Sequence, residues 1–321
     1  MHLNEFAADA GPLDMTTFDE FASLQRSAAE LGIPHPGFVR YVSRNVVVNH
    51  LRLHLLEWGD PSAPPVVLLH GGNQSAHSWD LVSLHLADRY HVYALDQRGH
   101  GDTEWVRDAD YSSPAMAADA AAFIAGEGLR DPIVFGHSMG GMVTLNLALS
   151  HPGVARGLVI VDMGPQVSEA GTRIIGNFVS KNREFDSIDE FVERVVKYDP
   201  FRTRAHMERT ARYNLIRRID GKYISKSDRI LHDEGFRRAR YEHAPRLGMD
   251  DVRAIDTPTL VVRGAQSNVL EAEGAERFVA ALPDGRLVTV PDCGHNVHSQ
   301  NTPGFLAAVQ PFLTALDAAR V

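Results

Sequence analysis

The sequence predicts an α/β protein built on a mostly parallel sheet with helices on both faces. Short apolar stretches at 65–69, 132–135 and 158–161 alternate with helical stretches over short connections. Strands that are apolar throughout are typical of parallel sheets buried on both faces, and strand–helix alternation is typical of this architecture. The composition agrees, because 44% of the 321 residues are apolar and 23% are charged, as in ordinary globular proteins.

A helix and a hairpin are expected before the alternating region. Residues 17–31 have the spacing of an amphipathic helix, which Thr16 or Thr17 could cap. Two strands joined by a tight turn are predicted at 39–49 and 51–58. The alternation that follows adds helices at 77–89, 115–126 and 139–150 and a strand at 91–95.

The strand–helix alternation stops near residue 165 and resumes near residue 255. In between, the sequence shows no clear buried strand and predicts helices at 187–198 and 203–218, with a further helical stretch to His243. The final strands and helices are expected at 259–263, 271–282, 286–290 and 303–319. The prediction is therefore an N-terminal helical extension (1–38), an α/β core (39–164 and 255–321) and a helical lid (165–254, hereafter the insert).

Charge and composition limit the classes of partner. The net charge of −9 argues against nucleic acid or an anionic membrane as a partner. The insert differs from the rest, with 19 Lys/Arg against 15 Asp/Glu. This excess of basic residues could favour anionic substrates, or it could simply reflect arginines on solvated helix faces.

Location and cofactors are constrained by what the sequence lacks. No stretch approaches the ~20 continuous apolar residues of a membrane span, and no signal peptide is expected. A single cysteine, Cys293, fits a reducing cytoplasm. Neither a metal motif nor a nucleotide-binding glycine loop is present. We therefore expect a cytoplasmic protein that acts on a small molecule without metal or cofactor.

The role of the N-terminal helix is left open by the sequence. The helix could extend the body, pack on the insert or form a homodimer.

The strongest motif is Gly136–Gly140 (GHSMG), which follows an apolar strand and opens a helix. This G-x-S-x-G pattern is typical of a nucleophile elbow, in which a sharp turn exposes the serine hydroxyl, so Ser138 is the candidate nucleophile. Residues 70–73 (HGGN) follow another buried strand. The backbone N–H groups of Met139 and of either Gly72 or Asn73 are the candidate oxyanion hole.

Together these motifs resemble the α/β-hydrolase superfamily, in its branch with a lid inserted after the sixth strand. The resemblance implies an eight-stranded, mostly parallel sheet and a cofactor-independent serine hydrolase. It also places the general base after the last strand, where His295 follows Gly294 and His298 is the competitor. The matching segments in chain order are 70–72 (HGG), 96–101 (DQRGHG), 136–141 (GHSMGG), 161–165 (VDMGP), 262–264 (VRG) and 294–295 (GH).

The catalytic acid is where the chain departs from this resemblance. In most members it follows the seventh strand, where this chain has Asn268. Asp162 could supply the acid from the end of the sixth strand, as in some members. Alternatively, Asn268 truly replaces the acid and weakens the site, or a nearby carboxylate of Glu271, Glu273 or Asp292 serves.

The expected substrate is a carboxylic ester or lactone of a small or medium apolar acyl compound. Trp79, His137 and Phe178 are candidate pocket residues. Serine at the nucleophile position argues against dehalogenase and epoxide hydrolase chemistry, which the superfamily performs with aspartate. Two alternatives remain open, namely a C–C bond hydrolase or lyase of the same fold and a slow-turnover protein that binds or senses a ligand.

Overall fold

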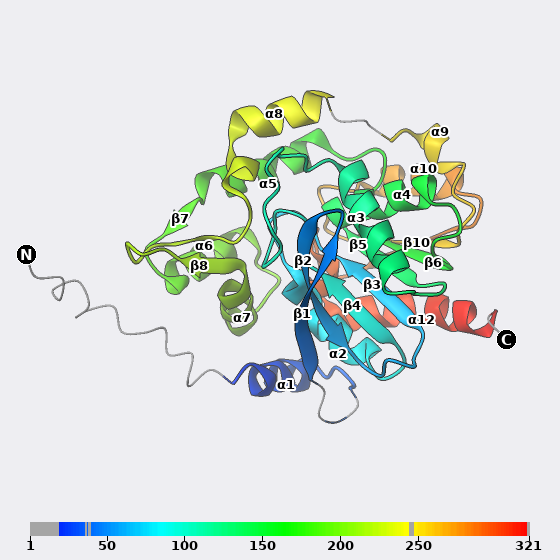
Figure 1. Cartoon of the computed structure of the whole chain (residues 1–321), viewed down its shortest axis with the longest axis horizontal. Coiled ribbons are helices and arrows are strands. Elements are labelled where there is room, and N and C mark those ends of the chain that lie inside the picture. Colours follow the sequence, from blue (N-terminus) through cyan, green and yellow to red (C-terminus); the bar gives the residue numbers. More distant parts are fainter. Residues whose placement is uncertain (1–18, 36, 38–39, 244–246, 320–321) are drawn as a thin grey trace, which may run out of the picture.

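Eight strands form one sheet in the order β1-β2-β4-β3-β5-β6-β10-β11 (Figure 1). The computed structural model describes residues 19–35, 37, 40–243 and 247–319. Strand β2 is antiparallel to both of its neighbours, and the other pairs are parallel, which confirms the predicted fold class. The strands are β1 (Tyr41–Val48), β2 (Leu51–Trp58), β3 (Pro65–Leu69), β4 (His91–Leu95), β5 (Ile133–His137), β6 (Gly157–Val161), β10 (Thr259–Gly264) and β11 (Gly285–Val290).

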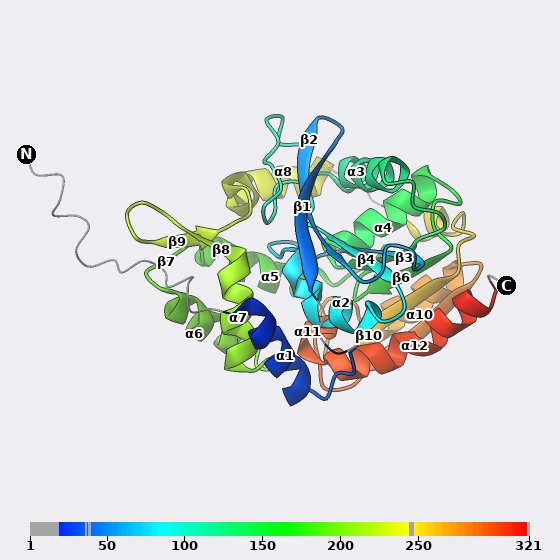
Figure 2. The ribbon, with the colours of Figure 1, turned by 60° about the horizontal axis from the view of Figure 1, so that its bottom comes forward.

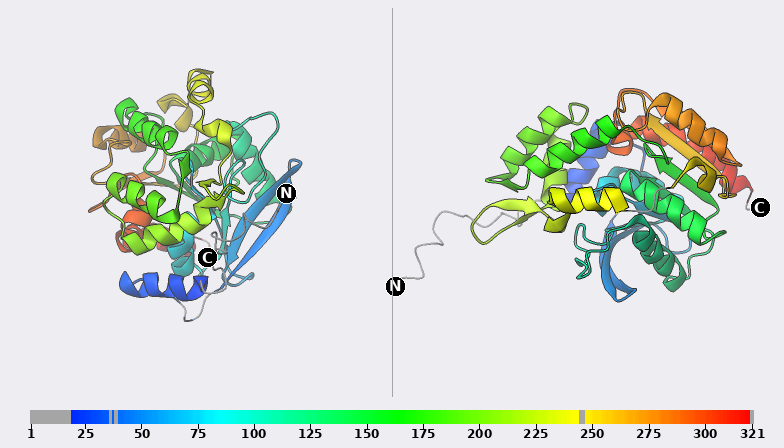
Figure 3. Two further views of the ribbon diagram at one scale, coloured as in Figure 1. Left: turned by 90° about the vertical axis from the view of Figure 1, so that its left-hand side faces the viewer. Right: turned by 90° about the horizontal axis from the view of Figure 1, so that it is seen from above.

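Helices cover both faces of the sheet (Figure 3). Alternate residues of β3 divide between the two cores, since Val66 and Leu68 pack on one face and Val67 and Leu69 on the other. The helix predicted at 77–89 is instead a 3-10 turn, η1 (Ala76–Trp79), followed by a shorter α-helix, α2 (Asp80–Leu86). The first face carries α1 (Glu20–Glu30), η1 (Ala76–Trp79), α2 (Asp80–Leu86), α11 (Val297–Gln300) and α12 (Thr302–Ala318); the second carries α3 (Ser113–Gly126), α4 (Met139–Ser150), α9 (Met249–Val252) and α10 (Ala272–Ala281).

The insert contains a small antiparallel sheet that the sequence did not predict. Its strand order is β7-β9-β8. The helix expected to run to residue 218 ends at Asn214, and a hairpin follows whose turn contains Gly221 at φ 88°. Strands of two or three residues are too short to leave an alternating pattern. The elements are α5 (Glu169–Lys181), β7 (Glu184–Phe185), α6 (Ile188–Tyr198), α7 (Arg204–Asn214), β8 (Leu215–Arg217), β9 (Tyr223–Ser225), η2 (Arg229–His232) and α8 (Glu234–His243).

The first helix, α1, touches both the body and the insert (Figure 2). It begins at Glu20, where the Asp19 side chain accepts the backbone N–H of Ala22, so the predicted threonine cap is wrong; Thr16 and Thr17 themselves lie outside the described residues. The hydroxyl of Tyr41 on β1 donates to Glu20 at 2.7 Å. The helix therefore extends the body and also packs on the insert, while a homodimer stays a prediction.

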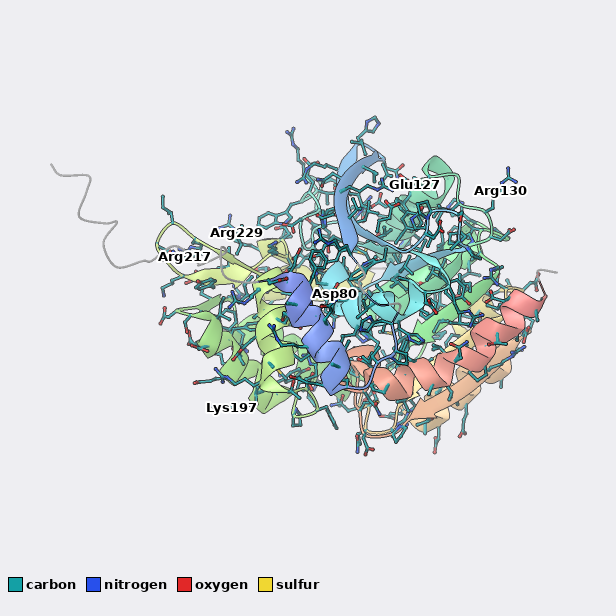
Figure 4. The ribbon with its side chains drawn as sticks, turned by 90° about the horizontal axis from the view of Figure 1, so that it is seen from below. Asp80, Glu127, Arg130, Lys197, Arg217 and Arg229 are labelled. Carbon is teal, nitrogen blue, oxygen red and sulfur yellow. The ribbon has the colours of Figure 1, made fainter. Side chains whose placement is uncertain are left out.

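Helix α7 of the insert is held against the body by buried polar contacts. Arg209 pairs with Asp80 at 2.6 Å, and both side chains are at most 5% exposed. Asp80 lies beside α1, at the edge of the body next to the insert (Figure 4). The ring of Tyr213 stacks on His77 with centroids 3.5 Å apart, and its hydroxyl donates to Glu20 at 3.2 Å. Because breaking a buried ion pair is costly, these contacts fix α7 relative to the sheet.

No described helix is both long enough and apolar enough to cross a lipid bilayer.

Candidate active site

Ser138 sits at a sharp turn between β5 and α4, as the motif predicts. Its backbone has φ 51° and ψ −114°, and its N–H donates to the carbonyl oxygen of Val161 at 3.0 Å. A β-carbon at Gly136 would lie 2.2 Å from the carbonyl oxygen of Gly140, and one at Gly140 would lie 2.2 Å from that of Leu69. Both glycines are therefore required for the close approach of chain segments that the turn needs.

The structure brings Ser138, His295 and Asp162 into one hydrogen-bonded chain. His295 Nδ1 lies 2.8 Å from Asp162 Oδ2, and His295 Nε2 lies 2.9 Å from Ser138 Oγ. A carboxylate can only accept, so Nδ1 carries the hydrogen and Nε2 is left to accept the serine proton. This is the arrangement that activates a serine hydroxyl.

Asp162 is fully buried and held by further hydrogen bonds from β10 and the loop after it. The N–H of Gly264 donates to Oδ1 at 3.1 Å, and the Ser267 hydroxyl donates to Oδ2, the oxygen that faces His295. Asp162 itself follows β6 at φ 50°, with its N–H donating to Val262. Sequence reasoning missed Ser267, and no local motif could have marked it, because its role depends on the pairing of β6 with β10.

The other candidate acids lie elsewhere. Asn268 is exposed, and its backbone carbonyl packs against Gly171 of α5. Glu271, Glu273 and Asp292 are exposed as well. Among the acids that the sequence left open, the geometry therefore favours Asp162, with Asn268 outside the hydrogen-bonded chain.

His298 and Trp79 belong to the core. Trp79 is 0% exposed and is not among the residues that line the cavity described below, so its prediction as a pocket residue is wrong. It packs edge-on to Phe135 and near Phe305, between the sheet and α12. The His298 ring stacks on Trp79 with centroids 4.0 Å apart, and neither of its nitrogens has a hydrogen-bond partner among the described residues.

His298→Phe is expected to make stability less sensitive to acid. Burial, with the nearby charge of Arg202, lowers the pKa of His298 well below its ordinary value, so the folded protein keeps this ring neutral. The unfolded chain binds a proton there below pH ~6.5, so stability falls as pH falls through that value. The free energy of unfolding of His298→Phe should therefore fall by about 1.4 kcal/mol less than that of the wild-type protein between pH 7.5 and pH 5.5.

Urea unfolding at the two pH values measures this difference. The exposed His151, changed to glutamine, is the control and should lose as much stability as the wild-type protein. An equal acid-induced loss in His298→Phe and wild type would contradict the prediction.

The candidate oxyanion donors lie beside the serine. Among the described residues, the N–H groups of Gly72, Asn73 and Met139 have no protein acceptor. All three residues line the same cavity as Ser138. Asn73 has φ 58°, and a β-carbon at Gly71 would lie 2.6 Å from His137 Nδ1, so a turn of this shape requires glycine at 71. Gly72 and Asn73 both remain candidates for the second donor.

His137 connects the nucleophile motif to the loop of the candidate base. Its Nε2–H donates to the carbonyl oxygen of His295 at 3.0 Å. Burial, together with the neighbouring His298 and His295, lowers the pKa of His137 well below its ordinary value, so the ring stays neutral. His137 also lines the cavity, in agreement with its prediction as a pocket residue.

A cavity of about 460 Å³ lies between the insert and the body and contains both Ser138 and His295 in its wall. Its size is within the usual range for small-molecule sites. Phe178 lines it, as predicted. Its other apolar lining residues include Met139, Met142 and Met163 from the body and Ile175, Phe191, Tyr198 and Leu215 from the insert.

Within the described part of the chain, His54, Asp96 and Asp102 form a group of possible metal-ligating residues outside the cavity lining. The Asp96 carboxylate already accepts the backbone N–H groups of Ala76 and Asp102, at 2.6 and 2.8 Å, and lies 2.7 Å from His54 Nδ1. The Asp102 carboxylate pairs with Lys226 at 2.8 Å. Protein donors therefore already occupy these ligand atoms.

Comparison with known proteins finds similar hydrolases. The chain is similar to the esterase Rv0045c of Mycobacterium tuberculosis, with 28% identity over 308 residues, covering 94% of this chain and 97% of the relative. It is 30% identical over 275 residues to the 3-hydroxybutyrate-oligomer hydrolase of Cupriavidus necator, covering 82% of this chain and 92% of that protein.

Solved structures are similar as well. The crystal structure of E-2-(acetamidomethylene)succinate hydrolase superposes with a TM-score of 0.77 at 23% identity, covering 86% of this chain and all of that one, which supports the fold. The crystal structure of Rv0045c gives a TM-score of 0.71 at 25% identity over 94% of this chain and 100% of that chain. The relatives support a hydrolase. The family described as alpha/beta hydrolase fold matches residues 64–302, and the chain therefore belongs to it.

Proposed function

We propose that this protein is a serine hydrolase that cleaves carboxylic esters or lactones through an acyl-enzyme on Ser138. The observation that carries the proposal is the hydrogen-bonded chain from Asp162 through His295 to Ser138, which ends at the wall of a mostly apolar cavity. The esterase among the relatives adds support for ester cleavage.

In the proposed cycle, the substrate carbonyl enters the cavity and Ser138 Oγ attacks its carbon while His295 Nε2 takes the hydroxyl proton. The carbonyl oxygen becomes an oxyanion, which the N–H groups of Met139 and of Gly72 or Asn73 stabilise. The imidazolium then gives its proton to the leaving alcohol. A water molecule, deprotonated by His295, attacks the acyl-enzyme and releases the carboxylic acid.

Asp162 orients His295 and stabilises its cation during both steps. Because it is buried and accepts hydrogen bonds from Gly264, Ser267 and His295, the carboxylate is held in position by protein donors. The size of the cavity supports a small or medium substrate, and its apolar lining supports an apolar acyl group.

Hydrolysis of p-nitrophenyl acetate and butyrate tests the proposal. The wild-type protein is expected to release nitrophenolate with a burst of one equivalent if deacylation is slow, and a fluorescent phosphonate should label Ser138 covalently. Peptide mapping of the labelled protein identifies the modified residue. Absence of both turnover and labelling would overturn the proposal.

A further inference from the structure

The cavity carries one permanent charge. Among the residues that the structure describes, Arg202 is the only arginine in the lining, and no lysine, aspartate or glutamate lines it. The adjacent His206 adds no charge, because burial and the neighbouring guanidinium of Arg202 lower the pKa of His206 to about 3. A guanidinium in the wall of a mostly apolar cavity attracts an anionic group, and no carboxylate in the described lining repels that group.

The guanidinium of Arg202 is held from one side. Its Nε donates to Asp199 Oδ2 at 2.9 Å, and the two side chains are 12% and 1% exposed. Asp199 also accepts from the N–H of Phe201 at 3.3 Å and lies 3.5 Å from Asn296 Nδ2. Within the described residues, the two Nη groups of Arg202 have no partner. They are therefore available to a ligand in the cavity.

The segment 199–202 packs against the loop that carries His295. Asn296, the next residue in that loop, contacts Asp199 and lines the cavity. A β-carbon at Gly294 would lie 3.4 Å from the Phe201 ring. Arg202 therefore follows a segment that lies beside the loop of the candidate base, and it lines the same cavity as Ser138 and His295.

We propose that Arg202 forms a subsite for a carboxylate on the substrate, so that the preferred ester carries a free carboxylate on its acyl or its alcohol side. Two parallel N–H donors match the geometry of a carboxylate, which Lys could not reproduce. One guanidinium suits a monoanion, whereas a phosphate dianion calls for more donors. The subsite rests on the proposed hydrolase function, because the substrate that it selects is the one Ser138 would cleave.

Two matched pairs of esters test the subsite. The pair 4-acetoxybenzoate and methyl 4-acetoxybenzoate places the carboxylate on the leaving group, and the pair mono-p-nitrophenyl adipate and p-nitrophenyl hexanoate places it on the acyl group. In wild type, kcat/KM should favour the anionic member of at least one pair. Arg202→Met should lower the ratio of kcat/KM for the anionic ester to kcat/KM for the neutral ester about 10- to 100-fold, the range for lost hydrogen bonds to a charged group.

Two further variants make the result specific. Arg204→Met removes the same charge two residues away, from a side chain that is 50% exposed, and should keep the ratio within threefold of wild type. Because Arg202→Met alone leaves Asp199 buried and unpaired, the double variant Asp199→Asn/Arg202→Met removes both charges together and should lose the same preference. A ratio that neither Arg202 variant changes, in either pair, would overturn the subsite.

Calorimetric binding to Ser138→Ala separates the two proposals, because it needs no turnover. The inactive protein should bind 4-acetoxybenzoate or mono-p-nitrophenyl adipate more tightly than the matched neutral ester, and adding Arg202→Met should remove the difference. If wild type cleaves none of the four esters while this Arg202-dependent binding holds, the hydrolase proposal fails and the subsite stands. If the esters are cleaved without any dependence on Arg202, the subsite fails and the hydrolase stands.

Discussion

Replacing Ser138 with alanine is expected to lower kcat for p-nitrophenyl butyrate by about six orders of magnitude, to the residual rate left when a catalytic serine is lost. The reason is that the remaining groups can still bind the ester and polarise its carbonyl, but no acyl-enzyme can form. The phosphonate label should also disappear. Nitrophenolate release is the measurement, with enough variant protein to detect the residual rate. Retention of more than a hundredth of the wild-type rate would contradict the assignment of Ser138.

Glycine at the same position separates chemistry from folding. Ser138 has φ 51°, in the left-handed region that non-glycine residues adopt at a cost of about 1–3 kcal/mol. Ser138→Gly should be as inactive as Ser138→Ala but more stable than it by about 1 kcal/mol, because glycine relieves the backbone strain. Urea unfolding of the two variants measures the difference. If glycine were no more stable than alanine, the turn would not be strained.

Asp162→Asn is expected to lower kcat by about four orders of magnitude, as the same exchange does in the serine-protease triad. The amide is neutral, so it does not stabilise the imidazolium, and its NH₂ group can hold His295 in the wrong tautomer. Substrate binding should change little, since Asp162 does not line the cavity. Steady-state kinetics with p-nitrophenyl butyrate should therefore show the effect in kcat and not in KM.

Asn268→Asp is the matched control for this variant. Asn268 is exposed and is not one of the residues of the hydrogen-bonded chain, so a carboxylate there should change kcat by less than threefold. A large gain in kcat from Asn268→Asp, or full activity in Asp162→Asn, would contradict the assignment of Asp162 as the catalytic acid.

The fold and part of the candidate site could be predicted because their signals are local. Apolar stretches followed by helices predicted the sheet and the helices on both of its faces, since parallel strands buried on both faces need apolar side chains throughout. The Gly136–Gly140 motif predicted the turn at Ser138, since the two glycines are needed where neighbouring chain segments come within 2.2 Å of their missing β-carbons. Each of these properties depends on a few consecutive residues.

The tertiary structure decided what depends on contacts between distant segments. Asp162 faces His295 across 133 positions of sequence, and Ser267 reaches Asp162 only because β10 pairs with β6. Trp79 looked like a pocket residue from its place after the oxyanion loop, but packing against α12 buries it. In the sequence, Arg202 is one of many arginines in a basic insert. It lines the cavity only because the insert packs over the body. Hydrogen bonds and burial of this kind join residues whose sequence separation carries no periodic signal, so only the folded chain determines them.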